Sequence, residues 1–329
     1  MGTLATVAGS DAPESRAQVL LRRLRSGDTL AHAITLVFAS SILFITALLI
    51  YELWIHSGPS RAKFGWHFFF TSTWDPIFGQ FGAWPFIYGT LVTTVVALVI
   101  AVPLGIGAAI FLSELAPPRL SKGLSFVIDL LAAVPSVIYG LLAIFTLVPL
   151  MRTTIEPFLK RTLGFLPLFR GPAYGVGFLT AGIVLAIMIV PYIISVSREV
   201  LLAVPQDQRE ASLGLGATRW ETTWKVVVSY AGVGIMGSIF LSMARALGET
   251  MAVTMVVGNT PRVSTSLLAP GYSIASVIAN EFAEAIGDLH LSALIELGLV
   301  LLALTLVLNA VARLLIVITS RRGTGAAHG

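Results

Sequence analysis

Two residues of opposite charge, Arg245 and Glu249, stand four positions apart in a long apolar stretch. On one continuous α-helix this spacing would place both side chains on the same face, about one turn apart. A guanidinium group is permanently charged and can donate two parallel hydrogen bonds to an oxyanion, so Arg245 is a candidate to attract an anionic substrate. Glu249 would orient Arg245 and weaken its hold on the anion. The hydroxyl groups of Ser242 and Thr250 are candidate additional donors.

The same pair also has a purely structural explanation. An arginine at the centre of a membrane helix costs about 2.5–3.5 kcal/mol on insertion scales, so it needs a partner or a water-filled cavity. A carboxylate one turn away supplies such a partner, and a buried ion pair can persist without adding stability. A substrate-facing pair and a self-neutralising pair that only fixes helix packing therefore both remain open.

The elements that must position these residues are membrane helices. Hydrophobic residues make up 56% of the 329 positions and charged residues 12%, with a mean hydropathy of +0.88. These values lie far outside the range of soluble domains. We predict an all-α membrane protein whose six transmembrane helices cover approximately residues 30–55, 86–112, 124–150, 176–197, 232–257 and 291–319.

An even number of spans puts both termini on one side of the membrane. If that side is the cytoplasm, most of the 21 lysine and arginine residues fall in cytoplasmic segments, as the positive-inside rule requires. The predicted organisation is a cytoplasmic tail at 1–28, a first transmembrane helix at 29–56, an extracytoplasmic loop at 57–85, a membrane domain at 86–319 and a cytoplasmic tail at 320–329.

Two outer segments have recognisable composition. The loop at 57–85 is rich in aromatic residues such as Trp66 and Trp74, which fits a belt at the membrane interface. The segment 258–290 is apolar and periodic between Ile274 and Ile286, which indicates a short helix at the outer mouth.

The longest charged stretch between predicted spans covers residues 204–230 and faces the cytoplasm in this topology. A polar helical hairpin between membrane spans is typical of a surface that contacts another protein. Trp220 and Trp224 share one helix face, and Gly216 supplies a hinge, which together suit a helix that docks in a groove. A helix that lies on the membrane surface is the alternative.

Other functional classes lack the residues they need. The chain has no cysteine, and its five histidines have no metal-ligand spacing. No G-x-x-x-x-G-K-[ST] nucleotide loop occurs, and the basic residues are dispersed, which argues against nucleic-acid binding. No nucleophile and base are arranged as in an enzyme. We expect no cofactor, metal or catalytic residue in this chain.

Residues 210–216 (EASLGLG) resemble the EAA-x-x-x-G loop of bacterial ABC-importer permeases, with Ser212 in place of the second alanine. Ser229 stands where the family pattern has a proline. In that family the loop forms a coupling helix that docks on the ATPase subunit. The resemblance implies an ATPase-coupling role for Glu210, Ala211 and Gly216, and the shared helix face of Trp220 and Trp224 suits the same role.

Residues 245–253 (RALGETMAV) and 133–141 (AVPSVIYGL) resemble motifs of the phosphate-importer permeases. The resemblance runs from about Trp84 to Ile318, and the leading tail and long first outer loop are more similar to the PstC type than to its PstA partner. It implies a type I, MetI-like permease domain at 86–319 and a permease subunit of an ATP-driven importer of inorganic phosphate in the bacterial inner membrane.

The resemblance also implies partners. They are a PstA-type sister permease, two copies of a PstB-type cytoplasmic ATPase that bind ATP and Mg, a PstS-type phosphate-binding protein and the lipid bilayer, with no nucleic acid. One rival is a permease for another tetrahedral oxyanion, such as sulfate or molybdate. A second is a gradient-driven secondary transporter or channel, which is less favoured because the sequence contains neither inverted repeats nor a dense proton relay.

Overall fold

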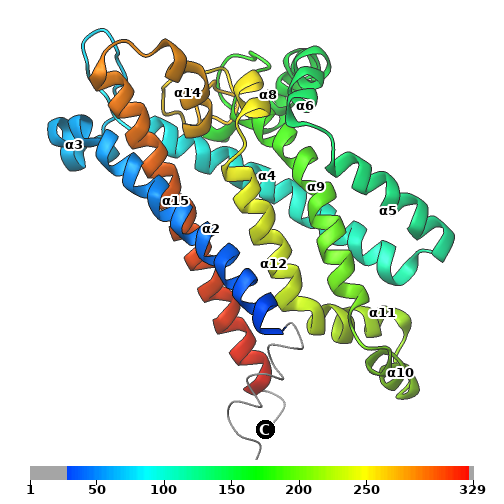
Figure 1. Ribbon diagram of the computed structural model, residues 1–329. Coiled ribbons are helices and arrows are strands. Elements are labelled where there is room, and N and C mark those ends of the chain that lie inside the picture. Colours follow the sequence, from blue (N-terminus) through cyan, green and yellow to red (C-terminus); the bar gives the residue numbers. More distant parts are fainter. Residues whose placement is uncertain (1–27, 326–329) are drawn as a thin grey trace, which may run out of the picture. The chain divides into compact units, whose positions relative to one another are not determined.

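The computed structural model describes residues 28–325 and, within them, the side chains of 31–314. The regular elements of this part are helices, with π-helical turns inside several of them and no strand (Figure 1). In chain order they are α2 (Asp28–His56), α3 (Gly58–Phe64), η1 (Gly65–Phe69), α4 (Trp84–Ile110), η2 (Phe111–Leu115), α5 (Pro118–Ala132), α6 (Ser136–Leu142), η3 (Ala143–Leu147), α7 (Val148–Leu150), η4 (Met151–Ile155), α8 (Glu156–Leu163), η5 (Pro167–Phe169), α9 (Phe178–Leu202), α10 (Gln206–Gly214), α11 (Arg219–Glu221), η6 (Thr222–Val227), α12 (Val228–Leu247), α13 (Met251–Val256), α14 (Ile274–Glu281), η7 (Phe282–Glu284) and α15 (Asp288–Gly325).

The chain divides into two compact units, residues 1–55 and 56–329. The described part of the first unit is essentially α2, whose apolar stretch Ala31–His56 has a mean hydropathy of 2.5. The predicted tail at 1–28 lies outside the described residues except for its last residue. The predicted tail at 320–329 is described only as far as Gly325, where α15 ends.

Six helical stretches of the described chain are long and apolar enough to cross a membrane, which confirms the predicted all-α, six-span class. They are Ala31–His56, Trp84–Leu115, Ser136–Leu163, Phe178–Leu202, Arg219–Leu247 and Asp288–Leu314. Because several of them run without interruption through η segments, a span in this fold combines α-helical and π-helical turns.

The prediction of a continuous third span over 124–150 is wrong. The helix α5 ends at Ala132, and the next helix begins only at Ser136. Pro135 has no backbone N–H and disfavours helical geometry at the residue before it, so the chain bends there. The membrane-length stretch is Ser136–Leu163, and α5 is a separate helix of 15 residues.

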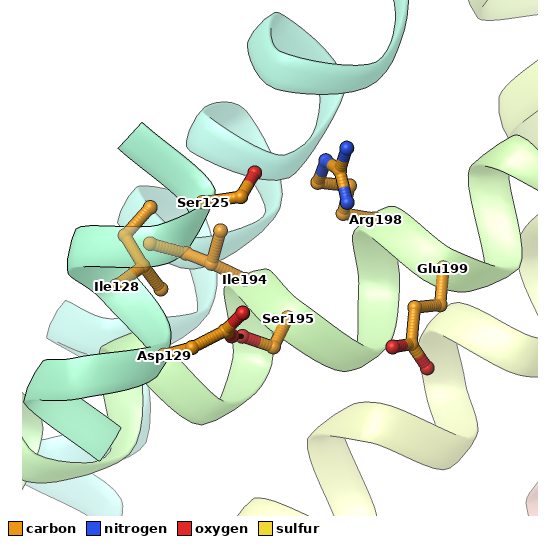
Figure 2. A pocket seen from close by; sticks show the side chains of 7 residues that line it. All are labelled: Ser125, Ile128, Asp129, Ile194, Ser195, Arg198 and Glu199. Carbon is orange, nitrogen blue, oxygen red and sulfur yellow. Dashed lines mark hydrogen bonds between the residues drawn. The ribbon is translucent and has the colours of Figure 1, made fainter. Parts of the chain in front are cut away.

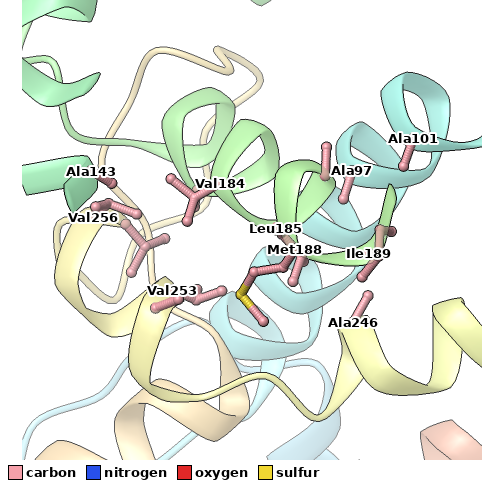
Figure 3. Close-up of a cluster of buried hydrophobic side chains, with 14 of the residues drawn as sticks. Ala97, Ala101, Ala143, Val184, Leu185, Met188, Ile189, Ala246, Val253 and Val256 are labelled. Atoms are coloured by element: carbon pink, nitrogen blue, oxygen red, sulfur yellow. The ribbon is translucent and has the colours of Figure 1, made fainter. Parts of the chain in front are cut away.

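The second unit is organised around α9, which packs against α4, α5, α6, α12 and α13. Within the apolar window of α9, 67% of the residues are buried, the largest share of any span. Small residues permit this close packing, since a Cβ atom at Gly182 would collide with Val96 of α4. Figure 3 shows the resulting core, in which Leu185 and Ile189 of α9 meet Ala97 of α4 and Ala246 of α12.

A second core forms around the segment 57–85, and it changes the interpretation of that loop. Phe68 and Phe81 are buried and pack with Phe86 and with Leu294 of α15. Because these two rings are buried, only other members of the aromatic set, such as the 80% exposed Trp66, are available for a membrane interface. The aromatic side chains of this loop therefore build a folded cap as well as an exposed rim.

The segment 258–290 contains the predicted short helix. It is α14, and the residues of its first turn are buried in the same aromatic core. Tyr272, just before the helix, is also buried, and burial raises the pKa of its hydroxyl group to about 12. Its oxygen accepts a hydrogen bond from the Asn280 side chain at 3.0 Å, which connects the helix to the residue just before it.

Candidate functional site

Arg245 lies in the last turn of α12 and is exposed. Its Cζ atom is 5.5 Å from the centroid of the Tyr192 ring on α9, a cation–π contact. A positive charge in the last turn of a helix also interacts favourably with the partial negative charge of that helix end. The guanidinium group is thus held between two helices with its charge accessible.

The prediction that Arg245 and Glu249 share one continuous helix over 232–257 is wrong. Helix α12 ends at Leu247 and α13 begins at Met251. Gly248 caps the end of α12, as expected of the residue with the lowest helix propensity after proline. Between the described side chains of Arg245 and Glu249 there is no ion pair, so the self-neutralising pair is not formed in this conformation.

Glu249 has a different role in the structure. Its Oε1 atom accepts a hydrogen bond from the backbone N–H of Ala252 at 3.2 Å, so it caps the first turn of α13. A carboxylate is favourable there because the N–H groups of a first helical turn carry partial positive charge. Glu249 therefore fixes the start of α13, and this interaction does not require Arg245.

The two predicted hydroxyl donors differ in accessibility. Thr250 is half-buried at the break between α12 and α13, and its Oγ1 donates to the carbonyl of Gly248 at 3.3 Å. Ser242 is fully buried, and its Oγ donates to the carbonyl of Ser238 at 2.8 Å. The structure brings Arg245, Glu249 and Thr250 to one accessible break, and it leaves Ser242 inside the helix packing.

A polar cluster that the sequence did not predict as a site lies between α5 and α9, and Figure 2 shows it from close by. Ser195 of α9 donates to Oδ1 of Asp129 on α5 at 2.6 Å. The adjoining cavity of about 20 Å³ is also lined by Arg198, whose Nε is buried without a hydrogen-bond partner. Arg198 and Glu199 stand three and four positions after Ser195, the spacings that place side chains on one helix face, and this was the signal available in the sequence.

A third region is the hairpin formed by α10, α11 and η6, which covers most of residues 204–230. None of the residues of α10 is buried, and Glu210 and Ala211 are exposed. Leu215, directly after the helix, is 90% exposed. Exposed apolar side chains at the end of a helix, here Leu215 together with the partly exposed Leu213, indicate a contact surface.

Arg209 anchors this exposed helix to the rest of the unit. Its Nη2 lies 2.9 Å from Oε1 of Glu114 in η2, and its Nε lies 3.3 Å from Oε2 of the same residue. The same guanidinium donates to the carbonyl of Leu201 at 2.8 Å and to that of Val204. Because α10 buries no residue of its own, these bonds and the Ser212–Thr222 hydroxyl pair at 3.0 Å hold it in position.

Gly216 provides the turn after α10. Its φ of +89° lies in the left-handed region that favours glycine, so the chain turns sharply at this residue. Thr218 then begins the next helix with a capping box. Its hydroxyl accepts a hydrogen bond from the N–H of Glu221, and the Glu221 carboxylate accepts one from the N–H of Thr218. The turn is therefore sharply defined on both sides.

Trp220 and Trp224 contact each other, as their spacing predicts. Their ring centroids are 5.7 Å apart with an interplanar angle of 77°, and both rings remain about half exposed. Edge-to-face aromatic pairs of this kind form rigid apolar surfaces. Together with Leu215, they make the hairpin a preformed surface for a partner.

The family comparison identifies this architecture. A family described as "Binding-protein-dependent transport system inner membrane component" matches residues 101–322, which include the break after Arg245 and the whole hairpin. The chain belongs to this family. It is a multi-pass permease of the inner membrane, and its hairpin at 204–230 lies inside the matched region.

Named relatives cover nearly the whole permease. It is 43% identical over 317 residues to the "Phosphate transport system permease protein PstC" of Mesorhizobium japonicum, covering 95% of this chain and 97% of the relative. It is 47% identical to the protein of the same name from Haemophilus influenzae, over 86% and 90% of the two chains. The "Phosphate transport system permease protein PstC 2" of Mycobacterium tuberculosis is 38% identical over 89% of this chain and 93% of the relative.

Solved structures show the same fold at low sequence identity. The permease aligns with a chain of the inward-facing MetNI methionine ABC transporter with a TM-score of 0.53 and 16% identity, covering 74% of this chain and 98% of the other. A chain of a bacterial alginate ABC transporter in complex with its periplasmic protein gives a TM-score of 0.56 and 13% identity, over 88% and 96%. These matches confirm the predicted MetI-like permease fold.

Proposed function

We propose that this chain is the permease subunit of an ATP-driven importer of inorganic phosphate and forms half of the membrane pathway. The observation that carries the proposal is its 43% identity, over 95% of its length, to a protein named as a phosphate transport system permease. The accessible guanidinium of Arg245 agrees with this substrate, since a permanent cation attracts phosphate at every physiological pH.

The orientation we propose has both termini and the α10 hairpin in the cytoplasm. The distribution of lysine and arginine supports it. In this orientation the loops around α8 and α14 face outward, because α9 runs from their side to the hairpin. The exposed Leu215, Trp220 and Trp224 then form the surface that docks on a cytoplasmic ATPase.

The partners in this proposal are a PstA-type sister permease, two copies of a PstB-type ATPase and a PstS-type phosphate-binding protein. ATP and Mg would bind to the ATPase copies and not to this chain. The exposed hairpin supports a separate energy-supplying subunit, because a surface of this kind needs a partner to cover it.

The contacts suggest how movement reaches the substrate. Arg209 connects α10 to the carbonyl end of α9, and Tyr192 lies ten residues earlier on α9, about 15 Å along the axis. Tyr192 contacts Arg245 on α12. A displacement of α10 is thus transmitted by one helix to the residue that faces the anion.

Alternating access follows from linkage in this arrangement. ATP binding and the loaded binding protein must favour the same outward-open conformation, because a ligand shifts an equilibrium only through its differential affinity. Phosphate then enters near Arg245, and hydrolysis restores the inward-open state. Release is possible because Arg245 holds the anion with an exposed rather than a buried charge.

The decisive experiment is to purify this chain with the subunits that accompany it and to reconstitute the complex in vesicles. We expect ATP hydrolysis to be stimulated by the phosphate-loaded binding protein and phosphate to accumulate in the vesicles. Stimulation by sulfate or molybdate instead would identify the other oxyanion permease. Uptake driven by an ion gradient without the ATPase would contradict the proposal.

A further inference from the structure

A second group of cationic side chains lies at the end of α9 that is distant from α10. A cavity of about 300 Å³ opens between the loop after η5 and the loop after α13. Its charged and hydroxyl-bearing lining residues are Arg170, Tyr174, Thr260, Arg262, Ser264 and Ser266. No carboxylate lines it, so the cavity has two positive charges and no negative one.

Both arginines have N–H groups available to bind a ligand. Arg170 donates from Nε to the carbonyl of Gly164 at 3.3 Å and from Nη2 to that of Phe165 at 3.0 Å. These bonds orient the guanidinium and leave three of its five N–H groups for a ligand. Arg262 is exposed, and neither arginine forms an ion pair with a described acidic residue.

The walls of the cavity are fixed by hydrogen bonds between η5 and the loop after α13 and by a further bond within that loop. The N–H of Leu267 donates to the carbonyl of Leu168 at 2.8 Å, and the hydroxyl of Ser266 approaches the same carbonyl at 3.4 Å. The N–H of Thr260 donates to the carbonyl of Gly271 at 3.0 Å. A site built on such connections is largely preformed, which lowers the entropy cost of binding.

The cavity is close in the chain to the break that holds Arg245. Only α13, a helix of six residues and about 9 Å, separates residues 248–250 from the loop that contributes Arg262. Arg245 is therefore a third arginine, close in sequence to the Arg262 that lines the cavity. When an ion meets two cationic sites one after the other, it can pass from the first to the second. It then does not have to leave a single strongly binding site in one step.

We propose that this cavity is an entry site for an inorganic oxyanion, in which Arg170 and Arg262 receive phosphate before it reaches Arg245. The identity of the anion as phosphate, and the outward position of the cavity, rest on the function proposed above. A carboxylate of a docked binding protein is the competing occupant. The recessed shape and the hydroxyl groups of Tyr174 and Ser264 favour a small tetrahedral anion, which accepts hydrogen bonds on all sides.

The chain offers a direct test because it contains no cysteine. Val263→Cys would put its only thiol at the cavity, and a membrane-impermeant anionic methanethiosulfonate would label it in the assembled complex. We expect inorganic phosphate to slow the labelling, and the slowing to disappear in the Arg170→Gln, Arg262→Gln background. Arg161→Gln, which removes an exposed charge on α8 outside the cavity lining, is the matched control and should keep it.

Labelling that none of phosphate, sulfate and molybdate slows would overturn the proposal. So would protection that survives the loss of both arginines. Because this readout follows phosphate at the cavity and not transport, it stays informative even if the wild-type complex imports a different anion. In that case sulfate or molybdate would protect the thiol while phosphate would not, which separates an error in the substrate from an error in the site.

A second measurement separates the entry site from a docking anchor. For the double variant we expect phosphate uptake to fall about tenfold or more, since each lost hydrogen bond to a charged group lowers affinity by roughly that factor. The affinity of the complex for the loaded binding protein should stay unchanged. A parallel loss of docking affinity would assign the arginines to a carboxylate of the partner and would contradict the entry site.

Discussion

Arg209 of α10 and Glu114 of η2 form a two-point ion pair, with Nη2 and Oε1 2.9 Å apart and both side chains largely buried. It connects an otherwise exposed helix to the end of the second membrane span. If α10 receives force from an ATPase, this pair transmits it.

Arg209→Ala should therefore uncouple ATP hydrolysis from uptake. Loss of one partner leaves the Glu114 charge uncompensated, and breaking a buried pair costs about 3–5 kcal/mol. The ratio of phosphate imported to ATP hydrolysed in reconstituted vesicles measures the effect. Lys225→Gln is the control, because it removes only an exposed pair with Glu221 at 3.6 Å and should leave the ratio unchanged. An equal ratio in both variants would remove Arg209 from the coupling route.

Arg245→Gln should reduce phosphate uptake by about tenfold or more, because hydrogen bonds to a charged donor contribute about 1.5–3 kcal/mol. The complex should still assemble, since the side chain is exposed. Uptake and the amount of complex in the membrane are measured together. Arg152→Gln, which changes another exposed arginine of a span, should have little effect. Normal uptake in the Arg245 variant would contradict the pathway assignment.

Tyr192 positions Arg245 through its ring. Tyr192→Phe keeps an aromatic face, so uptake should be close to normal. Tyr192→Leu should lower it roughly twofold to fivefold, which corresponds to a cation–π contribution of about 0.5–1 kcal/mol. The idea fails if the leucine and phenylalanine variants have the same uptake rate.

Two substitutions of Glu249 separate the effect of its negative charge from the effect of its hydrogen bond to the start of α13. Glu249→Gln keeps an oxygen that can accept from the Ala252 N–H but removes the negative charge, whereas Glu249→Ala loses both. Loss of the cap should weaken the start of α13 by about 0.5–2 kcal/mol. We expect the alanine variant to be less stable to detergent and heat than the glutamine variant. Equal stability would exclude the capping role.

Gly216→Val should uncouple transport by distorting the turn after α10. A β-branched residue at φ +89° costs about 1–3 kcal/mol, although no neighbouring atom blocks the side chain. Gly214→Ala is the matched control, because it lies in helical conformation with open space around it. ATPase activity without uptake is expected only for the valine variant, and coupled transport there would argue against a fixed turn.

The number and class of membrane helices followed from composition because a span needs about 20 apolar residues wherever it lies. The hairpin was equally readable, since Gly216 and the spacing of Trp220 and Trp224 act locally. The ion pair that anchors the hairpin could not be predicted, because Glu114 is distant in sequence from Arg209 and only the folded chain brings them together.

The candidate site was only partly predictable. Helical periodicity suggested that Arg245 and Glu249 share a face, but the single residue Gly248 ended the helix between them. Hydropathy does not respond to such a break, since the flanking residues stay apolar. The third span was misplaced for the same reason at Pro135. The two arginines of the outer cavity meet through loops whose geometry no periodic pattern encodes.

The early end of α12 has an electrical consequence. A helix terminus leaves its last carbonyl groups without intrahelical donors, and at this terminus the N–H groups of Gly248 and Glu249 satisfy only those of Ala244 and Ala246. The remaining dipoles amount to about half an elementary negative charge beside the guanidinium. An anion that reaches Arg245 thus meets repulsion from the peptide backbone itself, which shortens its stay and favours rapid turnover over tight retention.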